Sequence, residues 1–132
     1  MIHLVTGGSG SGKSAYAEQC ILDFGGTRRV YIATMQPFGA EGQARIARHR
    51  KMRAAKKFST IECYTNLKEV ELEPGSDVLL ECMSNLVANE MYMESGAGCH
   101  ADQAILEGIR KLNQQCSNLV IVTNEVFSES VP

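Results

Sequence analysis

The feature that most constrains this chain is a glycine-rich loop close to its first residue. The loop follows an apolar segment, residues 2–6, which is predicted to form a buried strand, and it precedes a helix predicted over residues 13–24. Glycines let such a loop curl until successive backbone N–H groups point at phosphate oxygens. The pattern G-x-x-x-x-G-K-S predicts a phosphate-binding loop made of Gly7, Gly8, Ser9, Gly10, Ser11, Gly12, Lys13 and Ser14.

Two residues of this loop have specific roles in the prediction. Lys13 is expected to act in catalysis by reaching the terminal phosphates of a nucleotide, and the Ser14 hydroxyl is expected to join a Mg²⁺ shell. The helix that begins near Lys13 directs its positive dipole end at the same phosphates. A flexible glycine linker is the alternative, but a linker would not follow an apolar strand directly. The chain is therefore predicted to bind a nucleotide.

Composition is that of an ordinary globular protein and argues against several partners. The chain of 132 residues is predicted to form one nucleotide-binding domain, residues 1–132, and its net charge of −2 argues against nucleic acid or an anionic membrane as partner. No apolar run reaches the length that spans a bilayer, so we expect no membrane span and a cytoplasmic protein. The five cysteines show no C-x-x-C spacing, which favours structural thiols in a reducing compartment.

Short apolar segments alternate with helical segments along the chain. Strands are predicted over residues 2–6, 29–34, 60–64, 77–82 and 119–123, and helices over residues 13–24, 41–57, 85–93 and 103–115. This alternation is typical of parallel strands that are covered on both faces. We therefore predict an α/β fold of the P-loop NTPase type (RecA-like), with a mostly parallel sheet and helices on both faces.

Polar residues just past the predicted strands are candidates for a site, because open parallel sheets bind ligands beyond the carboxyl ends of their strands. Glu81 follows the apolar residues 78–80, where phosphate-loop proteins place an acid that holds Mg²⁺ directly or through water. The usual residue there is Asp, and a strand-end acid can also be merely solvated or cap a helix. We predict Ser14 and Glu81 as the metal ligands.

More than half of the thirteen lysines and arginines lie between Arg45 and Lys57. On a helix, Arg45, His49 and Arg53 share one face because they are spaced four residues apart. The pattern alone favours a solvated basic face with a surface histidine, and a nucleic-acid patch would need interleaved aromatic residues. The chemical alternative is that the two guanidinium groups keep His49 neutral and bind phosphates while its imidazole attacks one.

Taken in order, these segments resemble the bifunctional adenosylcobinamide kinase / adenosylcobinamide-phosphate guanylyltransferase family of cobalamin biosynthesis. The likeness includes the phosphate loop, Y-I-A-T at residues 31–34, R-I-x-x-H-x-x-x-R from Arg45 to Arg53, and residues 62–63, 79–82, 89 and 122–126. The phosphate loop alone fits many functions. The Y-I-A-T segment together with the histidine pattern is far more specific and favours His49 as the nucleophile.

The resemblance implies two reactions. A nucleoside triphosphate, ATP or GTP, phosphorylates the aminopropanol hydroxyl of adenosylcobinamide. GTP then guanylylates His49 with release of pyrophosphate, and GMP passes to adenosylcobinamide phosphate to give adenosylcobinamide-GDP. The resemblance further implies Mg²⁺ as cofactor and a homo-oligomer, typically a trimer. It places nucleotide contacts at Ala33, Thr34, Met35, Arg50, Lys51, Met52, Arg53, Glu62 and Glu81.

The sequence departs from the family pattern in three places. Arg53 is followed by Ala-Ala-Lys-Lys-Phe instead of the common P-x-x-W, and Phe127 stands where a glycine is common. Family members also continue beyond Pro132 for a helix and a final strand, so the domain is expected to be shortened at its carboxyl end. Without those elements, a sheet edge and apolar surface are expected to be open.

Two other functions stay open at this stage. The chain could be a kinase-only phosphate-loop enzyme acting on a small molecule, in which His49 and the arginines only bind phosphates. It could also be an inactive nucleotide-binding or assembly module, because of its shortened end. A covalent GMP adduct on His49 would separate the bifunctional enzyme from both.

Overall fold

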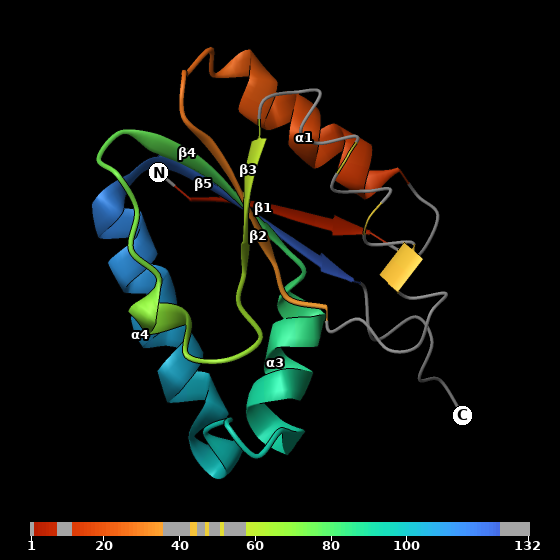
Figure 1. Ribbon diagram of the computed structural model, residues 1–132, viewed down its shortest axis with the longest axis vertical. Coiled ribbons are helices and arrows are strands. Elements are labelled where there is room, and N and C mark those ends of the chain that lie inside the picture. The colour runs from red at the N-terminus through yellow and green to blue at the C-terminus, as the bar shows by residue number, and fades with distance from the viewer. Residues whose placement is uncertain are drawn as a thin grey trace.

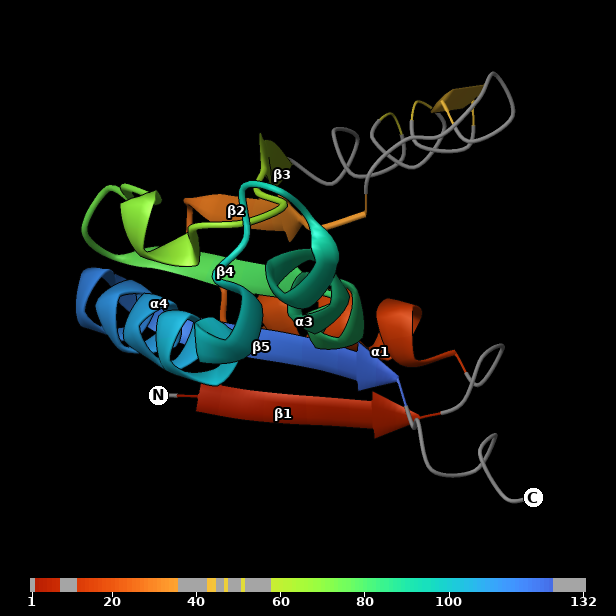
Figure 2. The ribbon, with the colours of Figure 1, turned by 90° about the horizontal axis from the view of Figure 1, so that it is seen from below.

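The computed structural model describes residues 2–7, 12–35, 43–44, 47, 51 and 58–124. Its centre is a sheet of five parallel strands in the order β1-β5-β4-β2-β3, which Figure 2 shows stacked from β1 at the bottom to β3 at the top. The strands are β1 (Ile2–Gly7), β2 (Arg29–Ala33), β3 (Phe58–Glu62), β4 (Ser76–Glu81) and β5 (Cys116–Asn124). This arrangement confirms the predicted α/β class.

Helices cover both faces of the sheet (Figure 1). Helix α1 (Lys13–Asp23) lies on one face, and α3 (Met83–Tyr92) and α4 (Ala101–Gln115) lie on the other. Two short 3-10 turns, η1 (Leu67–Glu69) and η2 (Gly98–His100), lie on the same side as α3 and α4. Within the described part of the chain, no helix combines the length and apolar character that crossing a bilayer requires.

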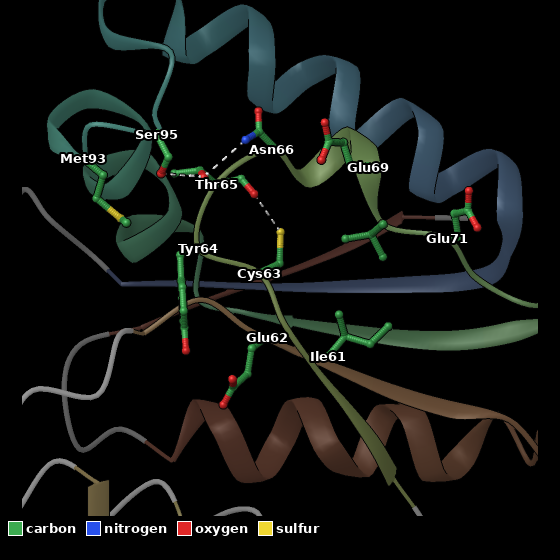
Figure 3. Close-up of a pocket in the computed structure, with 11 residues that line it drawn as sticks. Ile61, Glu62, Cys63, Tyr64, Thr65, Asn66, Glu69, Glu71, Met93 and Ser95 are labelled. Carbon is green, nitrogen blue, oxygen red and sulfur yellow. Dashed lines mark hydrogen bonds between the residues drawn. The ribbon is translucent and has the colours of Figure 1, made fainter.

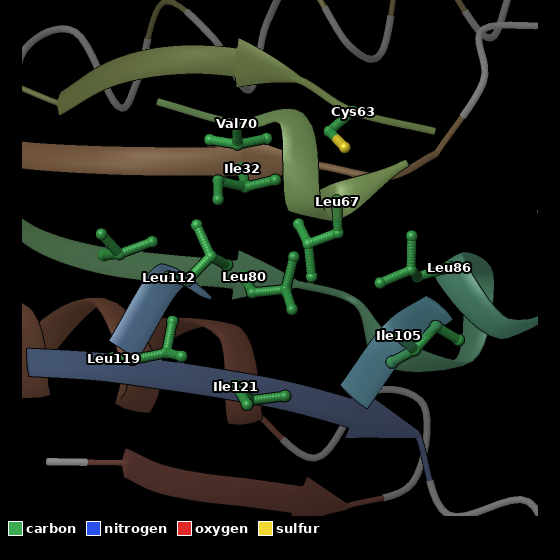
Figure 4. Close-up of a cluster of buried hydrophobic side chains, with 11 residues drawn as sticks. Ile32, Cys63, Leu67, Val70, Leu80, Leu86, Ile105, Leu112, Leu119 and Ile121 are labelled. Atoms are coloured by element: carbon green, nitrogen blue, oxygen red, sulfur yellow. The ribbon is translucent and has the colours of Figure 1, made fainter. Parts of the chain in front are cut away.

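Two apolar clusters hold these layers together. The larger lies between the sheet and α3, α4 and η1, and includes Leu80, Leu86 and Leu112, all fully buried (Figure 4). The smaller joins Ala17 and Ile21 of α1 to the opposite face of the sheet. Residues 76–80 of β4 are buried because this strand lies between β5 and β2 and its two faces pack in the two clusters beneath the helices. A continuous apolar run is what such a central parallel strand requires.

The strand predicted over residues 2–6 is confirmed, but the prediction that this strand is buried is wrong. Ile2 is 46% exposed and Leu4 is 65% exposed. The physical reason is position, because β1 is an edge strand of the described sheet and pairs with β5 alone. Its outward apolar side chains therefore remain accessible among the residues that the structure describes.

Other boundaries differ from the predictions by a few residues. Strand β3 begins and ends two residues before the predicted segment 60–64, and α3 begins two residues before the predicted Asn85. Strand β5 is longer than residues 119–123 at both ends. Of the predicted helix 41–57, only Gln43, Ala44, Ala47 and Lys51 are described, and all four have helical backbone and exposed side chains.

Gly108 lies where α4 packs most closely on η1, and this contact gives a first prediction. A Cβ added at Gly108 would lie 2.6 Å from Cβ of Leu67, closer than real Cβ atoms approach. We expect Gly108→Ala to lower the free energy of unfolding by about 1–3 kcal/mol, because overpacking outweighs the better helix propensity of alanine. Urea unfolding measures this change. Gln114→Ala, at an exposed position of the same helix, is the control, and a Gly108→Ala variant as stable as the parent would contradict the expectation.

Candidate active site

The strand register places two acidic residues on either side of Ala33 near the carboxyl edge of the sheet. Ala33 of β2 pairs with Glu62 of β3 on one side and with Glu81 of β4 on the other. From Glu81, the row of paired residues across the sheet continues to Val122 of β5 and then to Val5 of β1, two residues before the phosphate loop. Because all five strands are parallel, the ends of the loop strand and of both acidic strands meet at one edge.

Both glutamates belong to the face of the sheet that α1 covers. Leu79 and Phe58 pack in the cluster beneath α1, and side chains two residues apart on a strand point to the same face. Glu81 and Glu62 therefore project on the α1 side, and Figure 3 shows the Glu62 side chain pointing toward that helix. Glu62 is exposed and Glu81 is half-buried.

Helix α1 begins at this same edge because it follows the loop that leaves β1. Gly12 is its N-cap residue with φ 80°, a left-handed conformation that suits glycine. Lys13 is the first helical residue and is half-buried. The first backbone N–H groups of a helix lack partners within it, so this helix start can bind an anion.

Thr34, which follows β2, is completely buried and joined to the start of α3. Its hydroxyl accepts the N–H of Cys82 at 2.8 Å, and the side-chain amide of Asn89 donates to the Thr34 carbonyl at 2.7 Å. Met35, one residue further, is 45% exposed. The segment 33–35 therefore turns from the buried sheet to the surface at the edge where Glu81 lies.

A pocket of about 430 Å³ opens beyond the end of β3, and most of its lining residues lie on the side of the sheet away from α1 (Figure 3). One wall is the segment 61–71, and the other includes Met93 and Ser95, which follow α3. The hydroxyls of Thr65 and Ser95 lie 3.1 Å apart and join the two walls. Glu62 lines this pocket as well, so the pocket adjoins the acidic edge described above.

The buried carboxylate of Glu90 also joins the two loops that form these walls. One oxygen accepts the N–H of Asn66 at 2.9 Å, and the other accepts the N–H of Ala97 at 3.0 Å. Glu90 is 1% exposed, and a buried charge of this kind needs such partners. Helical periodicity did not identify this residue, because the donors come from loops that the pattern of α3 does not contain.

Cys63, at the base of the pocket, is unsuited to nucleophilic chemistry. Burial, together with the negative charges of Glu90 and Glu69, raises the pKa of its thiol to about 11. The thiol donates to the carbonyl oxygen of Thr65 at 3.2 Å and remains protonated at neutral pH. None of the five cysteines, all of them in the described part of the chain, forms a disulfide bond.

The structure brings together only part of the predicted site. Gly7, Gly12, Lys13, Ala33, Thr34, Met35, Glu62 and Glu81 all lie at the ends of elements along the carboxyl edge. Ser14 lies in α1, but its side chain is outside the description, and Lys51 is described apart from its neighbours. Outside the described residues lie Gly8, Ser9, Gly10, Ser11, His49, Arg50, Met52 and Arg53.

The chain is similar in sequence to proteins that are already known. The model of the family described as cobinamide kinase / cobinamide phosphate guanyltransferase matches residues 3–132. Bifunctional adenosylcobalamin biosynthesis proteins CobU of Salmonella typhimurium and Escherichia coli are each 36% identical to the chain, over all of it and 79% of each relative. The corresponding protein CobP of Pseudomonas aeruginosa is 31% identical over all of the chain and 76% of the relative.

Proposed function

Because this chain belongs to the cobinamide kinase / cobinamide phosphate guanyltransferase family, we propose that it carries out both reactions on adenosylcobinamide. In the first, the aminopropanol hydroxyl attacks the γ-phosphorus of ATP or GTP. A new P–O bond forms, the bond from the γ-phosphorus to the β–γ bridging oxygen breaks so that the nucleoside diphosphate leaves, and the hydroxyl proton passes to solvent. In the second, GMP passes from GTP to the new phosphate and yields adenosylcobinamide-GDP.

The observation that carries the proposal is the meeting of the loop strand, the start of α1 and Glu81 at one edge of the sheet. In the proposed binding mode, the loop residues 7–14 and the first N–H groups of α1 hold the phosphates of the nucleotide. Lys13 stabilises negative charge on the terminal phosphates as it develops in the transition state. Ala33, Met35 and Glu62 lie along the same edge and are proposed to contact the nucleotide, whereas Thr34, between Ala33 and Met35, is completely buried.

His49 is the proposed covalent nucleophile of the second reaction. A ring nitrogen of neutral His49 attacks the α-phosphorus of GTP, the bond to the β-phosphate oxygen breaks, and pyrophosphate leaves. An oxygen of cobinamide phosphate then attacks the same phosphorus, breaks the P–N bond and regenerates the imidazole. The intermediate divides one difficult transfer into two easier steps. Arg50, Lys51, Met52 and Arg53 are proposed to contact GTP beside it.

The described residues fit a Mg²⁺ ion that is held largely by the nucleotide. Among them, no three His, Cys, Asp or Glu side chains come together as a metal site of their own. Mg²⁺ is commonly bound by one or two carboxylates together with phosphates and waters, so Glu81 fits this role, and the Ser14 hydroxyl is proposed as a further ligand. When bound, the ion neutralises charge on the phosphate oxygens.

We further propose that the chain forms a homotrimer and acts in the cytoplasm, where ATP and GTP are available.

The test is to incubate the chain with Mg²⁺ and GTP labelled at its α-phosphate. We expect protein-bound label that survives alkali and is lost in mild acid, as a phosphoramidate is, and that passes to added cobinamide phosphate. Kinase turnover without such label would favour a kinase-only enzyme. GTP binding with neither turnover nor label would leave a nucleotide-binding module and refute the proposal.

A further inference from the structure

The side chain of Thr34, which directly follows β2, binds the backbone at the end of the neighbouring strand β4. The Thr34 hydroxyl oxygen lies 2.9 Å from the carbonyl oxygen of Cys82, to which it donates, and it accepts the N–H of the same residue at 2.8 Å. The Glu81 carbonyl oxygen lies 3.1 Å from that hydroxyl and accepts the N–H of Thr34 at 3.1 Å. One side chain therefore binds the backbone on both sides of the link between Glu81 and Cys82.

Asn89 closes this arrangement from the next helix. Cys82 is the N-cap residue of α3, and its carbonyl oxygen also accepts the first backbone hydrogen bond of that helix, from Leu86 at 3.2 Å. Asn89 lies on the same helix, and its amide donates to the Thr34 carbonyl at 2.7 Å. The end of β4, the start of α3 and the end of β2 are thus joined in one closed circuit of short hydrogen bonds.

We propose that Thr34 and Asn89 are positioning residues for Glu81, and that neither side chain contacts the nucleotide. They fix the backbone that carries Glu81, and so the direction from which its carboxylate approaches the bound Mg²⁺–nucleotide. The inference rests on the proposed function, because it takes Glu81 as the acid beside the phosphates. It changes the role of Thr34, which the resemblance places among the nucleotide contacts.

The surroundings of Thr34 explain why contact through its side chain is disfavoured. The residue is 0% exposed, and its N–H, its carbonyl and its hydroxyl all have partners within the protein. A ligand would have to displace buried hydrogen bonds, which costs about 1–3 kcal/mol for each group left unpaired. Mg²⁺ demands near-ideal octahedral geometry, so a small rotation of the Glu81 backbone weakens its hold on the ion.

The test measures GTP affinity by calorimetry, first with a chelator and then across a series of Mg²⁺ concentrations. Thr34→Val keeps the shape of the side chain but removes the hydroxyl, whereas Thr34→Ser keeps the hydroxyl. In Thr34→Val we expect a rise of about tenfold in the Mg²⁺ concentration at which the Mg²⁺-dependent gain in GTP affinity is half complete. This rise is equivalent to roughly 1.4 kcal/mol. In Thr34→Ser the rise should stay below about twofold, and both variants should bind GTP without Mg²⁺ as the parent does.

Asn89→Asp supplies a second, independent variant if Thr34→Val fails to fold. An ionised aspartate has the same shape but no N–H to donate to the Thr34 carbonyl, so the Mg²⁺ requirement should rise in the same direction. Val87→Thr is the matched control, because it makes the reverse isosteric exchange at an exposed position of α3. It should leave both affinities unchanged.

Three results would overturn the inference. Equal weakening of GTP binding with and without Mg²⁺ in Thr34→Val would show direct contact with the nucleotide. A lower melting temperature with an unchanged Mg²⁺ requirement in Thr34→Val and Asn89→Asp would show a purely structural role. A parent whose GTP affinity ignores Mg²⁺ would remove the role assigned to Glu81. Failure of the proposed function is distinguishable, since it would appear as missing adduct and product while the Mg²⁺ titration still responds.

Discussion

His49→Ala is expected to carry no acid-labile label after incubation with GTP labelled at its α-phosphate, whereas the parent chain carries it. GMP transfer should fall by about 10³-fold or more, because removing the nucleophile of a covalent mechanism removes the pathway and not merely a contact. Phosphorylation of cobinamide should persist, since that step transfers the γ-phosphate directly to the substrate hydroxyl.

His100→Ala is the matched control, because His100 is an exposed histidine of η2. It should retain the label and both activities. If His49→Ala keeps the label, the nucleophile is another residue. If neither protein carries label although both bind GTP and phosphorylate cobinamide, the covalent mechanism is excluded and the kinase-only enzyme remains.

Lys13→Ala should lower kinase turnover by about 10²–10³-fold, the usual effect of removing one group that stabilises charge in the transition state. Lys13 begins α1 directly after the left-handed Gly12, so it lies at the helix end that is located at the carboxyl edge of the sheet. Steady-state measurement with saturating nucleotide separates the loss of turnover from weaker binding.

Lys111→Ala provides the comparison, since Lys111 is an exposed lysine of α4 on the other face of the sheet. It removes the same positive charge from the chain, and its turnover should match that of the parent. Equal turnover in Lys13→Ala and the parent would mean that the loop does not hold the transferred phosphate during the reaction.

The parallel strands and their helices could be predicted because apolar runs and glycine signals are local. The shift of β3 could not, because Cys63 and Tyr64 are residue types typical of strands and yet lie in the turning segment that follows β3. That turn is set by Asn66, which has φ 57°, and by the hydrogen bond from the Cys63 thiol to the Thr65 carbonyl. Neither feature can be inferred from hydrophobic periodicity.

The sequence also did not predict which strand lies at the edge of the sheet or which distant segments pair. The apolar content of β1 predicts a strand but does not say that β5 would be its only partner in the described sheet. In the site, Lys13 and Glu81 follow from motif and strand-end position. The bonds that Thr34 and Asn89 make across the sheet depend on which strands become neighbours, which the order of segments leaves open.

Glu90 couples the two loops that flank the pocket beyond β3. Its two oxygens accept hydrogen bonds from Asn66 in one loop and from Ala97 in the other, two residues after the wall residue Ser95. Separating either wall from the carboxylate would leave part of a buried charge without its donor, which is costly. We therefore expect the two loops to open as one cooperative unit, so that the backbone amides of both should exchange with solvent together. The separation of the two loops is limited by the reach of the Glu90 side chain together with the contact between the Thr65 and Ser95 hydroxyls.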